Sequence, residues 1–126
     1  MIRKTWRHNS LKESFIGAFR GITIILKSER YARIVSIYGL LIILLSIVLG
    51  ASLVEIALLV AVITLVLVAE IFNAIVENIM NIVKPYRDPH IKVLKEASAG
   101  MVLLASFGAA IVGCLILLPK IIRIFR

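Results

Sequence analysis

Three long apolar stretches constrain this chain more than any other feature of its sequence. A membrane-spanning helix needs about 20 consecutive, mostly apolar residues, and residues 34–54, 56–83 and 97–118 each meet that requirement. Of the 126 residues, 61% are hydrophobic, which is more than soluble domains of this size contain. The sequence therefore predicts one all-α integral membrane domain over residues 1–126, with three transmembrane helices.

The basic residues lie beside the apolar stretches and indicate their orientation. Residues 1–33 contain eight Lys and Arg, the connection at residues 50–55 contains none, and the connection at residues 84–96 contains four. Cytoplasmic connections carry the excess of basic residues, so the N-terminus and the second connection are predicted to be cytoplasmic. Three basic residues near the C-terminus run against this rule. Because the basic residues flank spans and are not interleaved with aromatic residues, nucleic-acid binding is not expected.

An amphipathic surface helix is predicted over residues 10–30. Ser10 and Glu13 have the spacing of a helix-starting capping box. Apolar residues then recur on one helical face at Leu11, Phe15, Phe19, Ile22 and Leu26. A basic helix with such a face lies in the membrane interface. Packing of the same face against the chain's own spans is an equally good explanation.

The second apolar stretch is too long and carries polar residues. Its 28 residues extend about 42 Å at about 1.5 Å per residue, whereas the hydrocarbon core is about 30 Å thick. Five polar residues spaced by three or four lie on one side of this helix, and we call them the polar face: Glu70, Asn73, Glu77, Asn81 and Lys84. From Ile56, Glu70 lies about 21 Å deep. An intramembrane carboxylate costs about 2.5–3.5 kcal/mol on insertion scales and marks a functional site by default.

Carboxylates at these depths suit two chemical roles. A partly desolvated carboxylate such as Glu70 is a candidate general base, and Glu77, nearer the headgroups, suits Mg²⁺. Glu29 lies at a similar depth and is a second candidate metal ligand. Lys95 and Glu96 open the third span at this level, where a lysine suits phosphate. Two other classes stay open: an ion or proton conductor lined by the polar face, and a non-catalytic assembly protein that uses it as an oligomer seam.

The third stretch contains small residues at spacing four: Ala105, Ala109 and Gly113. This spacing predicts a helix-packing seam. Pro119 is expected to mark the outer end of the third helix, and Pro85 and Pro89 the end of the second. The lone Cys114 is expected to be a small buried apolar residue.

Four segments resemble one known family in order and spacing. "AEIFNAIVEN" resembles the E-x-x-N-x-x-x-E signature of the small prokaryotic diacylglycerol kinase and undecaprenol kinase family. "VLKEASAGMVLLAS" is similar to the family's third-helix entrance, and "SFIGAFRGITIILKSERYARI" to its surface helix. "VGCLILLPKI" resembles the end of the third helix in undecaprenol-kinase-like members. Together these segments extend from Ser14 to Ile121, along nearly the whole length of the chain.

The resemblance implies a homotrimeric, multi-pass lipid kinase of the prokaryotic plasma membrane. It implies MgATP-dependent phosphorylation of diacylglycerol or undecaprenol, in active sites shared between protomers. The catalytic base would be Glu70, supported by Asn73. Glu29 and Glu77 would hold the Mg²⁺ bound to ATP, and Lys95 and Glu96 would contact the nucleotide.

Three positions depart from the family pattern. Glu96 replaces the usual Asp, Asn81 stands where an acid is often found, and Ala74 replaces a common Ser or Thr. The residues with assigned chemistry are otherwise present, so we expect an active enzyme.

Overall fold

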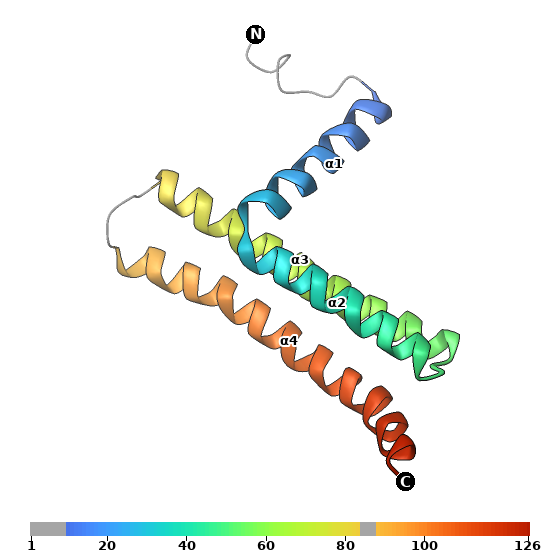
Figure 1. The fold of residues 1–126 in the computed structure, drawn as a ribbon. Helices are drawn as coiled ribbons and strands as arrows, with labels where there is room; N and C mark the ends of the chain where they lie inside the picture. Colours follow the sequence, from blue (N-terminus) through green and yellow to red (C-terminus); the bar gives the residue numbers. More distant parts are fainter. Residues whose placement is uncertain (1–9, 84–87) are drawn as a thin grey trace.

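The computed structural model describes residues 10–83 and 88–126, and within these residues it is entirely helical (Figure 1). Its four helices are α1 (Leu11–Ser28), α2 (Arg30–Val48), α3 (Leu53–Val83) and α4 (Pro89–Ile124). The last three are long and apolar enough to cross a membrane. The prediction of an all-α chain with three long apolar helices is confirmed.

The start and end of α1 are set by side chains that satisfy its terminal backbone groups. Ser10 is the N-cap, and its hydroxyl accepts a hydrogen bond from the Glu13 amide at 3.2 Å, as the capping-box spacing predicted. At the other end, the Arg33 guanidinium donates to the carbonyls of Leu26 (3.1 Å) and Lys27 (2.7 Å). Glu29 between the two helices is extended. The chain therefore bends here, and α1 leads away from α2 (Figure 1).

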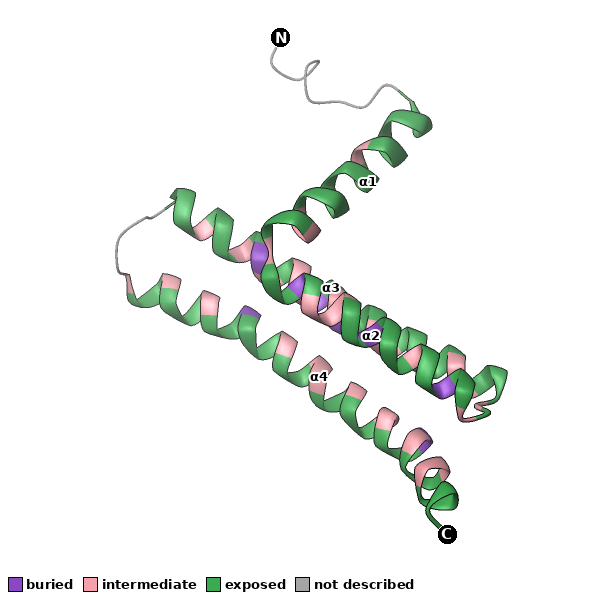
Figure 2. Cartoon of the chain, in the orientation of Figure 1, coloured by how far each residue is buried: buried purple, intermediate pink, exposed green. Residues whose placement is uncertain are grey.

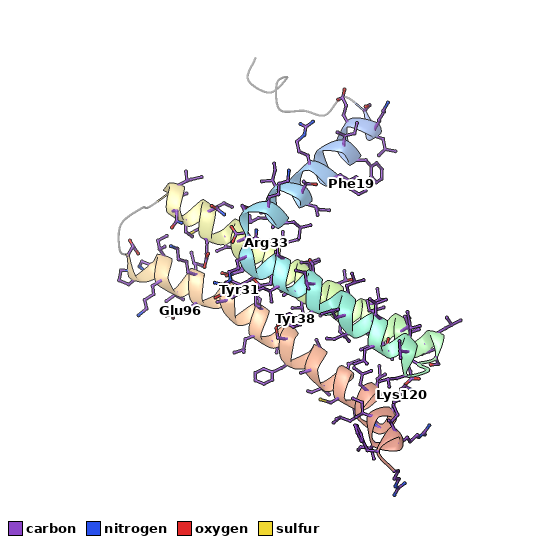
Figure 3. All side chains as sticks on the ribbon, viewed as in Figure 1. Phe19, Tyr31, Arg33, Tyr38, Glu96 and Lys120 are labelled. Carbon is purple, nitrogen blue, oxygen red and sulfur yellow. The ribbon has the colours of Figure 1, made fainter. Side chains whose placement is uncertain are left out.

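The apolar side of α1 does not pack on the chain's own spans. The helix has no buried residue, and Phe15 and Phe19 are 59% and 67% exposed. Figure 3 shows Phe19 on α1, clear of the other helices. Of the two explanations for this apolar side, packing on the spans is not observed within the chain. Its placement in the membrane interface stays a prediction.

The turn between α2 and α3 explains why α2 ends earlier than the expected boundary at residue 54. The helix ends at Val48, and Gly50 has a φ of +81°, a conformation that glycine adopts without strain. Ser52 and Glu55 then form a reciprocal capping box. The Ser52 hydroxyl accepts from the Glu55 amide (3.2 Å) and the Glu55 carboxylate accepts from the Ser52 amide (3.0 Å). This S-x-x-E spacing marks the start of α3 at Leu53, three residues before the expected boundary at Ile56.

Helices α2 and α3 approach each other closely at Gly39. A Cβ added to the buried Gly39 would lie 2.5 Å from Cγ2 of Ile63, so only glycine lets the helices come this near. The small seam on α4 is different. Ala109 and Gly113 line an apolar groove of about 390 Å³ between α2, α3 and α4, and a Cβ on Gly113 would meet no atom within 4 Å. The predicted seam on α4 is therefore not closed within one chain.

Two of the expected proline positions are wrong. Pro119 lies inside α4, which continues to Ile124, because a proline removes one helical hydrogen bond and need not end a helix held by other contacts. Pro89 is the first residue of α4 and does not end α3. Asp88 caps this start by accepting from the His90 amide at 2.8 Å, and proline is favoured at the first helical position. Lys84 and Pro85 lie outside the described residues.

Most of the surface of the long helices is exposed in the isolated chain (Figure 2). In the most apolar 18 residues of each helix, 17% of the residues are buried in α2, 17% in α3 and only 6% in α4. The free Cys114 is likewise exposed, contrary to expectation. Apolar surface of this extent needs lipid or other protein around it, which agrees with a membrane protein.

Candidate functional site

Helices α3 and α4 run antiparallel, and two lysines of α4 fix their register. At one end, the Lys95 ammonium donates to the side-chain oxygen of Asn81 at 2.8 Å. At the other end, Lys120 forms an ion pair of 3.1 Å with Glu55. The first contact places the start of α4 against the polar face of α3. It also gives Asn81 a role, because this amide now holds the lysine that was predicted to bind phosphate.

Asn73 is held by a residue that the sequence reasoning missed. The Ser98 hydroxyl donates to the Asn73 side-chain oxygen at 2.8 Å and also lies 2.9 Å from the Lys95 carbonyl oxygen. Ser98 is only 4% exposed. One signal could have found it: Ser98 follows Lys95 by three residues, so both lie on the side of α4 that meets α3.

The three predicted carboxylates come from two different parts of the chain. Glu70 and Glu77 lie two helical turns apart on α3, and Glu29 lies at the bend between α1 and α2, where its side chain does not cap α2. The charges of Glu29 and Glu77 both act on the Glu70 carboxylate. Glu70 is half-buried and Glu77 is exposed. The fold thus brings two further acids, Glu29 and Glu77, within electrostatic range of Glu70, the least exposed acid of the polar face.

Glu96 does not join this group. Its side chain is 68% exposed and lies 3.9 Å from the ammonium of Lys92, one turn earlier on the same helix. Figure 3 shows Glu96 toward the start of α4, the half of that helix that also carries Lys95. Within this chain Glu96 therefore contacts none of the other predicted site residues.

The acidic groups offer a metal few protein ligands. Within the described part of the chain, no three His, Cys, Asp or Glu side chains lie together as a metal site. Mg²⁺ does not require such a cage, because it usually keeps several waters and binds one or two carboxylates together with substrate phosphates. Glu29 and Glu77 fit that pattern of two carboxylates, with phosphate oxygens and water as the remaining ligands.

Polar groups do not continue along α3 beyond this end. Between Ile56 and Ala69 the only polar side chain is Thr64, and the groove beside it is lined by apolar and small residues. A conducting pathway would need polar groups across the full membrane thickness. The site instead combines a half-buried carboxylate, further acids and a lysine at one end of the bundle, which suits the transfer of a phosphoryl group.

A comparison with known protein families decides between a conducting pathway and phosphoryl transfer. A model of the prokaryotic diacylglycerol kinase family matches residues 17–117. The chain belongs to the prokaryotic diacylglycerol kinase family. The match spans every predicted site residue, from Glu29 to Glu96. Comparison with curated proteins gives no match.

Membership of the prokaryotic diacylglycerol kinase family supports a lipid kinase, with ATP and a membrane lipid as its substrates. Together with the three apolar helices it supports a multi-pass membrane protein. It does not favour the ion or proton conductor.

Proposed function

We propose that this kinase transfers the γ-phosphoryl group of ATP to the hydroxyl of diacylglycerol or undecaprenol. The arrangement that carries the proposal is the half-buried Glu70 with the charges of Glu29 and Glu77 acting on it, and Lys95 held by Asn81 about three turns further along α3. Phosphoryl transfer is catalysed mainly by positioning and by neutralising charge. A base, two acids and a lysine at one membrane surface supply the groups for both tasks.

Each side chain has a proposed role that follows from its position. Glu70, deepest on the polar face, accepts the proton of the lipid hydroxyl as that oxygen attacks the γ-phosphorus. Asn73, one turn away, donates hydrogen bonds that keep the reacting groups in line. Lys95 binds phosphate oxygens of ATP through its ammonium. Glu96 is proposed as a further nucleotide contact, which would require it to leave Lys92.

Glu29 and Glu77 are proposed to hold the Mg²⁺ that accompanies ATP. Bound there, the ion would neutralise phosphate charge beside the acids. Free carboxylates at this end would otherwise repel the nucleotide.

The proposed orientation places the polar end of α3 and the N-terminus in the cytoplasm, where ATP is available. The basic residues of the first 33 positions and of the second connection support this orientation. Lys120, at the opposite end, is paired with Glu55, so one of the three C-terminal charges that run against the rule has a structural partner. With this orientation, the apolar side of α1 would lie in the inner interface of the prokaryotic plasma membrane.

The active unit is proposed to be a homotrimer with sites shared between protomers. The groove beside Gly113 and the exposed apolar side chains of α4 leave surface for neighbouring copies. Within one chain, Glu96 and Lys92 are exposed and paired with each other. A neighbouring protomer could therefore complete the nucleotide site.

The test is a side-by-side transfer assay. Purified protein is placed in vesicles that contain diacylglycerol, undecaprenol or neither, and radiolabelled MgATP is added outside. The proposal predicts label in a lipid phosphate from at least one alcohol, and loss of that product when the divalent ion is chelated. Folded, oligomeric protein that labels neither lipid would contradict the proposal, whereas the favoured alcohol identifies the acceptor.

A further inference from the structure

Ser98 is a buried polar residue at the contact between the two helices that form the site. Its relative exposure is 4%, and it is one of two buried polar residues among those described. The other, Ser46, donates to the Ile43 carbonyl of its own helix at 2.7 Å and contacts no site residue. Ser98 differs because its hydroxyl reaches across to Asn73 on α3.

The hydroxyl of Ser98 has one proton and two acceptors within reach. The Asn73 side-chain oxygen lies at 2.8 Å and the Lys95 carbonyl oxygen at 2.9 Å. A serine within a helix often makes only the second kind of bond, back to its own helix. The bond to Asn73 does more, because it fixes the position of the oxygen of the Asn73 side-chain amide.

An asparagine side chain can present either its oxygen or its nitrogen to a neighbour, and the two ends differ in hydrogen-bonding character. The oxygen only accepts and the nitrogen only donates, through two N–H groups. With the Asn73 oxygen bound to Ser98, the nitrogen on the same carbon points away from α4's serine. It is then free to donate along the polar face, where Glu70 and Glu77 lie one turn to either side.

We propose that Ser98 is a positioning residue that holds the Asn73 amide with its N–H donors toward the reacting groups. This inference rests on the proposed function, because those groups are the Glu70 carboxylate, the lipid hydroxyl and the phosphate. All are negative or become negative during transfer. Donors facing them stabilise the transition state, whereas a reversed amide would present an oxygen and repel them.

Removing the Ser98 hydroxyl should change the orientation of the Asn73 amide but not the packing of α3 and α4. Without Ser98, the partly buried Asn73 oxygen would lose its partner, and the amide could reverse at little cost. Alanine at position 98 would leave packing almost unchanged, since it removes only one oxygen atom. The predicted defect is therefore in catalysis and not in folding.

The experiment compares five forms of the protein in the lipid transfer assay: wild type, Ser98→Ala, Ser98→Thr, Asn73→Ala and the double variant Ser98→Ala/Asn73→Ala. Ser98→Ala is expected to lower kcat about 3- to 10-fold, the effect of one lost hydrogen bond, with the KM for ATP unchanged. Ser98→Thr keeps the hydroxyl and should restore most of the rate. In the Asn73→Ala background, Ser98→Ala should cause no further loss, because the group it positions is already absent.

Ser106→Ala is the matched control, since Ser106 lies about two turns further along the same helix and is also partly buried. It should leave kcat and KM as in wild type, and thermal melting should show that both alanine variants are folded.

Three results would overturn the inference: an unchanged kcat in Ser98→Ala, a kcat loss that adds to that of Asn73→Ala, or a rise in the KM for ATP alone. The last would place the effect on Lys95. These three results would leave the proposed function intact. Wild-type protein that labels no lipid would instead overturn the proposed function, and the inference with it.

Discussion

Lys95 and Lys120 lie in opposite halves of α4, and each contacts a side chain of α3. Lys120 is paired with a carboxylate, that of Glu55, at 3.1 Å. Lys95 is held at 2.8 Å by the neutral amide of Asn81. The two contacts join the same pair of helices with similar geometry, but only one of them neutralises the lysine.

The difference separates a structural contact, that of Lys120, from the Lys95 contact, which we propose to be functional. An ammonium paired with a carboxylate attracts a second anion only weakly, because the carboxylate already neutralises its charge. An ammonium held by a neutral amide keeps its attraction for anions. The Glu55 carboxylate also belongs to the capping box that starts α3, so the Lys120 contact stabilises the turn and the helix pair. Lys95 is held in place but remains able to bind phosphate. Asn81, one of the three departures from the family pattern, fits this account, because an acid at that position would compete with ATP for Lys95.

The largest difference between the two lysine contacts should come from removing each lysine in turn. Lys95→Met is expected to lower kcat/KM for ATP about 10- to 100-fold, since a charge-assisted hydrogen bond is lost, with little change in thermal stability. Lys120→Met should do the reverse and lower the melting temperature with near-normal kinetics of the folded protein. Steady-state kinetics and thermal melting of the same preparations measure both. Equal losses of kcat/KM in Lys95→Met and Lys120→Met would contradict the proposal that the two lysines have different roles.

A smaller effect should follow from exchanging the acceptors. Asn81→Asp gives Lys95 an ionic partner, and the KM for ATP should rise about 2- to 5-fold, as for a weak, solvent-accessible ion pair. Glu55→Gln, the mirror exchange, should leave the KM unchanged and slightly lower the melting temperature. The rise in KM should shrink at high salt, because screening weakens exposed ion pairs. A KM that falls in Asn81→Asp would show that Lys95 does not gain from a neutral partner.

Much of this fold can be predicted because membrane helices are long and uniformly apolar. The three apolar helices, the helix before them and its Ser10 cap all follow from the sequence. The boundaries were harder, because they depend on local contacts. Gly50 and the Ser52–Glu55 capping box end one helix and begin the next, and Pro119 is accommodated within α4. Proline marks a helix end only where nothing else holds the helix together.

The site, like the fold, has a part that the sequence predicts and a part that depends on contacts between helices. The spacing of Glu70, Asn73 and Glu77 predicts one helical face, since it needs only the geometry of a single helix. The contacts of Ser98 and Asn81 depend on the register between α3 and α4, which no single-helix pattern contains. For Glu96, proximity to Lys95 in sequence suggested a shared site. Its side chain turns instead to Lys92, because adjacent residues of a helix point in different directions.

The central claim is that Glu70 is the base for transfer of phosphate to a lipid hydroxyl, and Glu70→Gln tests it most directly. Glutamine keeps the size of the side chain but cannot accept the proton. We predict that the variant binds MgATP with the affinity of the wild type, measured by equilibrium binding in vesicles, and forms no lipid phosphate above background. Lipid phosphorylation at the wild-type rate by Glu70→Gln would contradict the account.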